Sequence, residues 1–384
     1  MRSMITGLLL AGVVTFTAAA GERARDLGIP FDGRTGPLNA ITDVPGVKVG
    51  HESVIKDLPE NRAVRTGVTA VLPLGDATLH QPVFAGWFAL NGNGEMTGTT
   101  WIEESGFLEG PVMITNTHSV GTVHQAMIEW RVKKGQADAT GYWWSLPVVA
   151  ETWDGHLNDI NGFHVKARHA HAALERASGG PVPEGNVGGG TGMICHEFKC
   201  GIGTSSRIAE TASGSWTVGV LVQANYGLRD TLRIAGVPVG QHLTQDRAYA
   251  NLAQPVLESG SIIVVVATNA PLLPHQLKRL ARRASLGVAR VGGMAGNGSG
   301  DIFVAFSNAN AGAAAGGDGN VTVTMHPNDS ISPLFDATVL ATEEAIVNAM
   351  VAARDMTGDR GHTAKAIDHG QLRDVLRQYN RLDD

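Results

Sequence analysis

Short runs of aliphatic and β-branched residues recur along the chain and alternate with longer amphipathic stretches. The runs predict buried strands at 47–54, 67–72, 112–115, 192–198, 216–223, 261–267, 302–306 and 321–325. Apolar positions at helical spacing predict helices at 121–134, 162–177, 275–284 and 334–353, with a short helix near 371–378. Several buried strands separated by helical segments predict an α+β fold, in which two stacked sheets carry helices on their outer faces. No internal repeat is apparent, and we expect residues 21–384 to form one domain.

The first 20 residues have the pattern of a secretory signal peptide. Arg2 supplies the positive charge, residues 8–16 form a short apolar core, and three alanines end at Ala20. The apolar core is too short to span a bilayer, although an uncleaved anchor is the alternative. We therefore expect export, most simply to a bacterial periplasm.

Composition narrows the class of partner. The formal net charge is −6 and the basic residues are dispersed, which argues against nucleic acid as a partner. Glycine is abundant at 49 residues and aromatic residues make up 5%, whereas the apolar content is ordinary. This composition favours tightly packed strands with many bends.

The chain has two cysteines, Cys195 and Cys200. An exported protein permits a disulfide between them, because it folds in an oxidising compartment. If both cysteines lie in one extended strand, they are about 17 Å apart and cannot bond. Since 192–198 is predicted to be a strand, we expect them to be unbonded.

A Gly260-Ser261 pair runs without a spacer into the apolar strand that follows. If the chain were cut between these two residues, Ser261 would carry a hydroxyl and a free α-amine on a rigid strand. The amine, with an ordinary pKa of about 7.7–8.0, could act as base for its own hydroxyl. An ordinary turn entering a strand is the alternative. Ser215 and Ser299 also follow a glycine, so spacing alone does not select the residue.

Three other groups of polar residues are candidates for chemistry. Ser299 and Asp301 precede the 302–306 strand at a spacing of two, which would place a hydroxyl and a carboxylate on one face. Asn225 ends a core strand, where its amide could donate to an oxyanion. Glu151 and Trp153 could hold a substrate amine against an apolar wall. Each group also has a plain structural interpretation, as turn residues or as a packed loop.

Patterns that would indicate a cofactor are absent from the sequence. The glycine run at 185–192 does not follow a predicted strand, does not open a helix and has no adjacent lysine, which excludes the dinucleotide and P-loop interpretations. A structural glycine loop near the site is the better interpretation. The histidines at 164, 169 and 171 lie among basic residues, so a solvated helix face is favoured over a metal site. We expect no cofactor and no metal.

Taken together, five strings closely resemble the family of L-aminopeptidase/D-esterase and β-peptidyl aminopeptidase enzymes. They cover residues 43–51, 188–193, 223–225, 261–272 and 298–303, and the resemblance extends over nearly all of the chain after residue 20. It implies a four-layer αββα sandwich, like that of N-terminal nucleophile hydrolases but with different strand connectivity. It also implies a precursor that cleaves itself between Gly260 and Ser261 into residues 21–260 and 261–384. The two chains stay together in a homo-oligomer of heterodimers, a tetramer or an octamer.

The resemblance further implies roles for individual residues. Ser261 would be the nucleophile and its own base, which selects it over Ser215, and Asn225 would be the side-chain oxyanion donor. Ser299 and Asp301 would orient Ser261 and its amine. Where this chain has Asp301, a glutamate can occur in relatives, which shortens the reach of the acid without removing its role.

The substrate side of the site follows by the same resemblance. Glu151 would bind the free amino group of the substrate, and Trp153 would line the same pocket. Some relatives have tyrosine at the Trp153 position, which leaves the specificity of the pocket open.

The expected function is therefore a self-processing aminopeptidase that acts on short peptides and amides through an acyl-enzyme on Ser261. Removal of β-amino acids is implied by the resemblance alone. The alternatives are an L- or D-amino acid amidase or esterase, and an amino-acid acetyltransferase of related fold, which would cleave before threonine rather than serine. A periplasmic glycine-rich binding protein without catalysis is the alternative from another class.

Overall fold

The structure is a computed structural model and describes residues 21–135, 141, 144–250, 260–315 and 319–382. The expected leader at 1–20 lies outside these residues, as does the segment 251–259 before the expected cleavage site. Two sheets make up the centre of the molecule. One has four strands in the order β1-β2-β5-β6, and the other has six in the order β4-β3-β12-β11-β10-β9.

The four-stranded sheet consists of β1 (Lys48–Leu58), β2 (Arg62–Leu72), β5 (Val112–Asn116) and β6 (Val148–Thr152). The six-stranded sheet consists of β4 (Phe107–Leu108), β3 (Val83–Gly92), β12 (Gly300–Ser307), β11 (Ser261–Thr268), β10 (Gly214–Asn225) and β9 (Ile202–Thr211). Neighbours in each sheet are antiparallel except β5–β6 and β11–β12, which are parallel.

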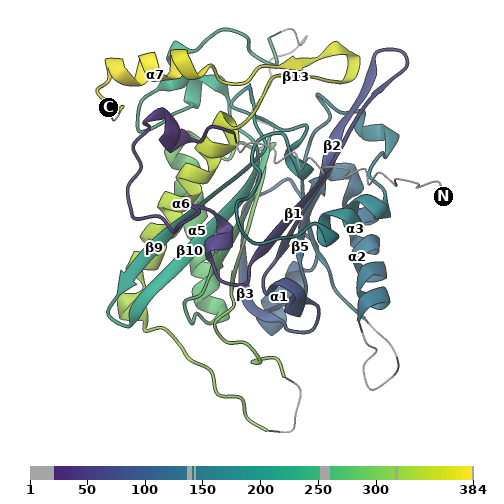
Figure 1. Cartoon of the computed structure of the whole chain (residues 1–384), viewed down its shortest axis with the longest axis vertical. Coiled ribbons are helices and arrows are strands. Elements are labelled where there is room, and N and C mark those ends of the chain that lie inside the picture. Colours follow the sequence, from purple (N-terminus) through teal and green to yellow (C-terminus); the bar gives the residue numbers. More distant parts are fainter. Residues whose placement is uncertain (1–20, 136–140, 142–143, 251–259, 316–318, 383–384) are drawn as a thin grey trace, which may run out of the picture.

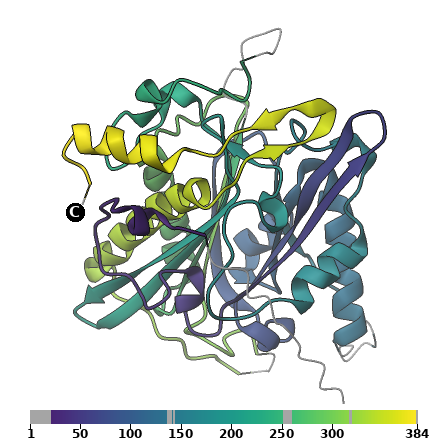
Figure 2. The ribbon, with the colours of Figure 1, turned by 45° about the horizontal axis from the view of Figure 1, so that its top comes forward.

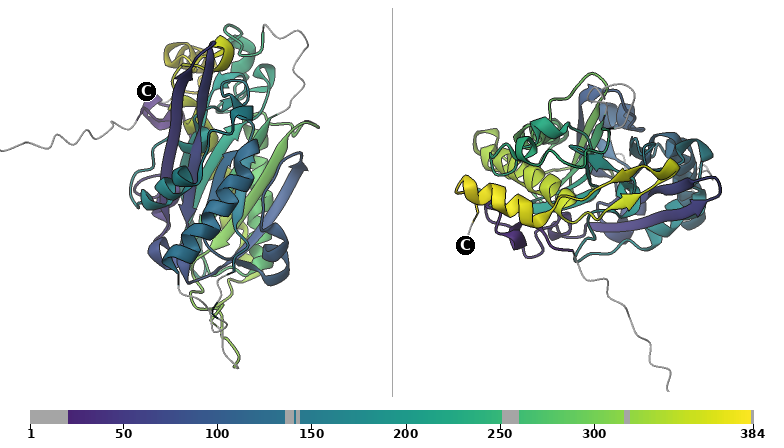
Figure 3. Two further views of the ribbon diagram at one scale, coloured as in Figure 1. Left: turned by 90° about the vertical axis from the view of Figure 1, so that its right-hand side faces the viewer. Right: turned by 90° about the horizontal axis from the view of Figure 1, so that it is seen from above.

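Helices cover the outer face of each sheet (Figure 1). The six-stranded sheet carries α5 (Pro274–Arg290) and α6 (Ser332–Val351), and the four-stranded sheet carries α2 (Val120–Lys134) and α3 (Ala167–Glu175). The inner faces of the two sheets pack on each other through a separate apolar cluster that includes Val71, Ile114, Leu221, Val265 and Val304. The layers are therefore helix, sheet, sheet and helix, and an edge-on view of them is given in Figure 3.

Strand β11 explains why an apolar run without alternation can form the centre of such a sandwich. Ile262, Val264 and Val266 pack towards α5 and α6, while Ile263 and Val265 pack towards the second sheet. All residues of β11 are buried, because both faces of this strand are covered.

Shorter elements complete the fold. They are α1 (Thr99–Ser105), α4 (Val239–His242), α7 (His369–Gln378), the hairpin of β7 (Ile194–Cys195) and β8 (Phe198–Lys199), and the pair β13 (Met356–Thr357) and β14 (Thr363–Ala364). The C-terminal segment with β13, β14 and α7 crosses one end of the sandwich (Figure 2). None of the helices in the described part of the chain is long and apolar enough to cross a membrane.

Three expectations from the sequence are wrong. Residues 321–325 are extended but form no strand, and their side chains are exposed. Residues 192–198 do not form one strand but enter the β7–β8 hairpin. In this hairpin Cys195 and Cys200 form a disulfide with a Cα–Cα distance of 5.4 Å, because the turn brings them together, which an extended strand would not do.

Candidate active site

Ser261 opens β11 near the middle of the six-stranded sheet. It pairs with Asn225 of β10 on one side and with Gly300 of β12 on the other. Directly paired residues point to the same face of a sheet. The face shared by Ser261 and Asn225 is the one towards the four-stranded sheet, since Ile263 packs there and Gln223, its partner, reaches strands β5 and β6. The two side chains therefore lie at the end of the layer between the sheets.

The peptide bond before Ser261 is held by two donors. The Ser261 hydroxyl donates to the carbonyl oxygen of Gly260 at 2.7 Å, and the Gly300 amide donates to the same oxygen at 3.0 Å. A Cβ on residue 260 would lie 2.3 Å from the Asn225 carbonyl oxygen and 2.5 Å from Tyr226 Cα. Glycine is thus required at 260 by close backbone packing, and the Ser261 hydroxyl is kept beside the preceding carbonyl group.

The Asn225 amide has a fixed orientation. Its Nδ2 donates to the carbonyl oxygen of Trp153 at 2.8 Å, and its Oδ1 accepts from the Ile194 amide at 2.8 Å. The two contacts distinguish the nitrogen from the oxygen, because a reversed amide would lose both. One Nδ2 hydrogen remains available to a group bound beside Ser261.

Asp301 lies on β12, on the other face of the same sheet, and Ser299 directly precedes this strand. The Ser299 hydroxyl donates to Asp301 Oδ1 at 2.7 Å, and both side chains are buried. Asp301 pairs with Ile262, whose side chain packs towards the helices. The Asp301 side chain is therefore on the opposite face of the sheet from the Ser261 hydroxyl.

Glu151 is a buried carboxylate at the end of β6. One oxygen accepts from the Glu95 amide at 3.0 Å, and the other accepts from the Thr117 hydroxyl. Burial raises the pKa of Glu151, and the two hydrogen bonds only partly oppose this rise. Among the described residues, no arginine or lysine forms an ion pair with Glu151. A buried carboxylate of this kind can hold a cation that the chain itself does not supply.

Glu151 lies close to the peptide that pairs with Ser261. A Cβ on Gly94 would be 3.1 Å from Gly300 Cα and 3.2 Å from Glu151 Oε1, so a single glycine separates them. Trp153 has 42% of its surface exposed, and its carbonyl contacts the Asn225 amide. Ser261, Asn225, Glu151 and Trp153 are thus brought to one end of the molecule by three strands.

The other candidates lie elsewhere or have structural contacts. Ser215 is exposed and sits at the opposite end of β10 from Asn225. The glycine run forms a buried turn at Gly188–Gly190, where a Cβ on Gly189 would be 2.1 Å from Gln223 Oε1. This position agrees with a structural loop near the site.

The histidine interpretation needs correction. His169 is buried rather than solvated, and His164 contacts Asp159 at 3.0 Å. His171 Nε2 donates to the Ala126 carbonyl oxygen at 2.9 Å. Within the part of the chain that the structure describes, no group of three or more His, Cys, Asp or Glu side chains could hold a metal ion.

Sequence reasoning missed several residues that support the site. Gln223 Nε2 donates to the Thr115 carbonyl oxygen at 3.0 Å and to Thr152 Oγ1 at 2.8 Å, which joins the two sheets beside Asn225. Its position two residues before Asn225 in a strand was a usable signal, since residues at this spacing share a face. Thr117 carried no such signal, because its contact joins the turn after β5 to Glu151 on strand β6.

Comparison with known proteins identifies the family. The model of peptidase family S58 matches residues 39–364. The chain belongs to this family. It is an aminopeptidase of the hydrolase class, and the predicted family, fold class and enzyme class are confirmed.

Curated relatives match along almost their whole length. The β-peptidyl aminopeptidase BapA of Sphingosinicella microcystinivorans is 52% identical over 99% of this chain and 97% of its own. The β-peptidyl aminopeptidase BapA of Sphingosinicella xenopeptidilytica is 46% identical over 96% of this chain and 94% of its own.

Solved structures agree with this S58 assignment. The L-aminopeptidase D-Ala-esterase/amidase from Ochrobactrum anthropi, described as a new variant of the Ntn hydrolase fold, is 52% identical with a TM-score of 0.88, over 94% of this chain and 99% of that one. A β-aminopeptidase from Burkholderia sp. is 50% identical with a TM-score of 0.85, over 93% and 99% of the two chains.

Proposed function

We propose that this S58 peptidase is a self-processing serine aminopeptidase that releases N-terminal residues, including β-amino acids, from short peptides and amides. The observation that carries the proposal is the Ser261 hydroxyl, 2.7 Å from the Gly260 carbonyl oxygen, on a peptide that a second donor polarises. A serine in an ordinary turn would need neither the second donor nor the packing that forces glycine at 260.

In the processing step, Ser261 Oγ adds to the carbonyl carbon of Gly260. The hydroxyl proton passes to the Ser261 nitrogen as the C–N bond breaks, which leaves an ester between Gly260 and the Ser261 oxygen. Water then hydrolyses the ester to a carboxylate on Gly260 and a free amine and hydroxyl on Ser261. The Gly300 amide stabilises the charge that develops on the Gly260 oxygen.

The mature enzyme would use the same groups for its substrate. Departure of Gly260 leaves the Gly300 amide and one Asn225 Nδ2 hydrogen to donate to the substrate oxyanion beside Ser261. Ser261 Oγ attacks the carbonyl of the first residue, its α-amine takes the proton and gives it to the leaving amine, and water releases the acyl group. Asp301, with Ser299, would orient and charge-balance the α-amine of Ser261.

Glu151 supplies the specificity for a free amino terminus. A substrate ammonium would pair with its carboxylate, whose buried charge has no ion-pair partner among the described residues. A β-amino acid places its amine one carbon farther from the carbonyl than an α-amino acid does. The β-peptide assignment is supported by the two curated relatives at 52% and 46% identity.

A second candidate activity is hydrolysis of L- or D-amino acid amides and esters without a β-preference. It is favoured by the similarity to the Ochrobactrum anthropi L-aminopeptidase D-Ala-esterase/amidase. Turnover of the p-nitroanilides of β-alanine, L-alanine and D-alanine distinguishes the two, because a β-peptidyl aminopeptidase hydrolyses the first fastest.

The proposal also includes the localisation of the protein and its oligomeric state. Residues 1–20 would direct export to the periplasm and be removed, and the αβ units would assemble into a homo-oligomer. Expression with the leader, followed by fractionation and light scattering of the periplasmic protein, tests both. Full-length protein in the cytosol, or a monomer in solution, would contradict them.

Denaturing electrophoresis tests the processing directly. The mature chain should give two bands of about 25 and about 13 kDa, the shares of 40.3 kDa that residues 21–260 and 261–384 represent. The Ser261→Ala protein should remain one inactive band, while Ser215→Ala, the matched control at the other end of β10, should be cut as usual. A Ser261→Ala protein that still splits would show that another residue is the nucleophile.

A further inference from the structure

A small hairpin braces the end of strand β10. It comprises residues Met193–Cys200 (the 193–200 hairpin), with strands β7 and β8 joined by a turn at His196 and Glu197. Both turn residues have positive φ, 48° and 62°, a conformation that costs a non-glycine residue energy. The Cys195–Cys200 disulfide closes the hairpin. Strained backbone of this kind persists only where the surroundings impose it.

Arg229 imposes the turn from one side. Its guanidinium donates to the carbonyl oxygens of both turn residues, at 2.9 Å each, and lies over the ring of Phe198. The Arg229 amide also donates to the Glu197 carboxylate at 3.2 Å. The turn is therefore held rigidly by a fully buried arginine.

Lys199 holds the other side of the hairpin. Its side chain is completely buried, and its Nζ donates to the carbonyl oxygens of Met193, at 2.8 Å, Cys200 and, more weakly, Gly190. No carboxylate forms an ion pair with it among the described residues, and burial lowers its pKa well below the ordinary value. A buried lysine with only carbonyl partners is costly, and a methionine would fill the same space at a lower cost.

The hairpin contacts the β10 end at two points. The His196 amide donates to the Tyr226 carbonyl oxygen at 2.7 Å, and the Ile194 amide donates to Asn225 Oδ1 at 2.8 Å. The second contact belongs to the peptide between Met193 and Ile194, whose carbonyl oxygen Lys199 holds. One peptide group thus links the buried Lys199 Nζ to the Asn225 amide, which pairs with Ser261 in the sheet.

The Met193 side chain contacts strand β6. The Thr152 hydroxyl contacts Met193 Sδ at 2.9 Å, and Gln223 donates to that hydroxyl. Trp153, the next residue, accepts from Asn225. One of the two contacts that orient the Asn225 amide therefore comes from the 193–194 peptide itself, and the other comes from the residue that follows Thr152, which the Met193 side chain contacts.

We propose that the 193–200 hairpin, with Lys199 at its centre, is a positioning device for Asn225 in the proposed reaction. Lys199 fixes the 193–194 peptide, and the Ile194 amide then holds Asn225 Oδ1 away from Ser261. The Asn225 Nδ2 is left as a donor to the oxyanion. Without this restraint the amide can rotate and present its oxygen to the developing negative charge, which removes a donor and adds repulsion. The inference rests on the proposed function.

A double-mutant cycle with Lys199→Met and Asn225→Ala tests this role. Rates are measured on the p-nitroanilide of β-alanine and divided by the amount of processed chain. Lys199→Met should lower kcat by about 10- to 100-fold and change KM by less than about twofold. In the Asn225→Ala background the same substitution should change kcat by less than about twofold, because its effect passes through that amide.

If the reductions in kcat of the two single variants multiply in the double variant, the proposal is wrong. Such independence would mean that Lys199→Met lowers kcat by destabilising the fold and not through Asn225. A Lys199→Met enzyme with normal kcat would also overturn it. Lys278→Met, which removes an exposed lysine paired with Glu103, is the matched control and should leave kcat unchanged.

If the Lys199→Met chain fails to fold or to process, the Cys195→Ser/Cys200→Ser variant takes its place in the double-mutant cycle with Asn225→Ala. It opens the hairpin but keeps the lysine, and its loss of kcat should likewise vanish in the Asn225→Ala background. The Ser261→Ala variant, assayed in parallel, tests the proposed function separately from the positioning role of the hairpin. Full turnover by Ser261→Ala would refute the proposed function itself, whereas an inactive Ser261→Ala with an additive cycle would refute only the positioning role.

Discussion

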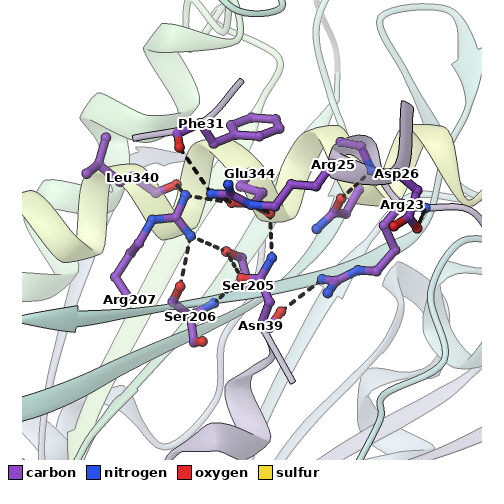
Figure 4. A network of polar contacts seen from close by, with 12 residues as sticks. Arg23, Arg25, Asp26, Phe31, Asn39, Ser205, Ser206, Arg207, Leu340 and Glu344 are labelled. Carbon is purple, nitrogen blue, oxygen red and sulfur yellow. Dashed lines mark hydrogen bonds and ion pairs between the residues drawn. The ribbon is translucent and has the colours of Figure 1, made fainter. Parts of the chain in front are cut away.

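Two buried glutamates, Glu344 and Glu151, occupy very different surroundings. Glu344 lies on α6, where it accepts from Arg25 at 2.8 Å and from Arg207 at 2.6 Å, and Asn39 also donates to it (Figure 4). Burial alone would raise the pKa of Glu344, but the Arg25 hydrogen bond and the two guanidinium charges outweigh it, and the pKa lies below its ordinary value. Its charge is neutralised within the chain.

Glu151, beside Ser261, has only neutral donors among its hydrogen-bond partners, and burial raises its pKa. The comparison separates two uses of a buried charge. At Glu344 the chain supplies its own cations and gains a link between residues 21–260 and α6. At Glu151 burial of the carboxylate is costly, and in the proposed function the substrate ammonium supplies the cation.

The largest effect on stability is expected from Glu344→Gln. Removing the carboxylate leaves the fully buried Arg207 guanidinium without its counterion and takes a partner from the partly exposed Arg25, which should cost about 3–5 kcal/mol in the free energy of unfolding. Denaturant unfolding measures it, with Glu210→Gln as the control, because Glu210 pairs with Arg34 on the surface and should cost less than about 1 kcal/mol. Equal costs for the two variants would show that the Glu344 network contributes nothing special.

Apart from loss of the nucleophile Ser261 itself, the largest effect on catalysis is expected from Asn225→Ala. Loss of one oxyanion donor should lower kcat by about 10²–10³-fold. Steady-state kinetics on processed enzyme measures this. The substitution also leaves the Ile194 amide and the Trp153 carbonyl unpaired, so the free energy of unfolding should fall by about 1–3 kcal/mol. A kcat within about threefold of the parent enzyme would remove Asn225 from the mechanism.

Glu151→Gln is the most direct counterpart of Glu344→Gln. The same chemical change should leave stability unchanged or raise it at position 151, whereas it should lower stability at position 344. It removes the charge that would pair with the substrate ammonium, so kcat/KM should fall by about 10- to 100-fold, the equivalent of a charged hydrogen bond. Stability should be unchanged or higher, because a buried charge without an internal counterion disappears. A loss of stability equal to that of Glu344→Gln would contradict the distinction.

The smallest expected effect is a pH dependence of substrate binding. A raised pKa means that Glu151 takes up its proton at a higher pH than an exposed carboxyl group, and the protonated form cannot pair with ammonium. KM should therefore rise as the pH falls through this raised pKa. The neighbouring Glu95 also raises the pKa of Glu151, whereas His118 lowers it. Folding favours the protonated form of Glu151, so its contribution to stability should grow over the same fall in pH. A KM with the same pH profile in Glu151→Gln would assign the effect to another group.

Much of the sandwich was predictable because its central strands are apolar on both faces. The runs at 216–223, 261–267 and 302–306 correspond to β10, β11 and β12, and the apolar stripe at 334–353 corresponds to α6. Strands β3, β6 and β9 were missed, since glycines, polar residues or short length broke their patterns. Residues 321–325 alternate like a strand, but the described chain offers them no pairing partner.

Site residues could be predicted where they stand at the end of a recognisable strand. They could not be predicted where their role depends on contacts between segments far apart in the sequence. Ser261 and Asn225 each stand at the end of a recognisable run, and register brings them together. The contacts of Thr117 with Glu151 and of Lys199 with Met193 depend on how distant segments pack. The disulfide between the cysteines was unpredictable for a similar reason, because a two-residue turn that the sequence pattern did not indicate brings them together.

Mass spectrometry of the purified, denatured protein tests the central claim most directly. The account predicts two polypeptides, of which the smaller begins with the free amine of Ser261, and no turnover from any chain that keeps the Gly260–Ser261 bond. A single uncut polypeptide that hydrolyses the β-alanine anilide at the full rate would contradict it.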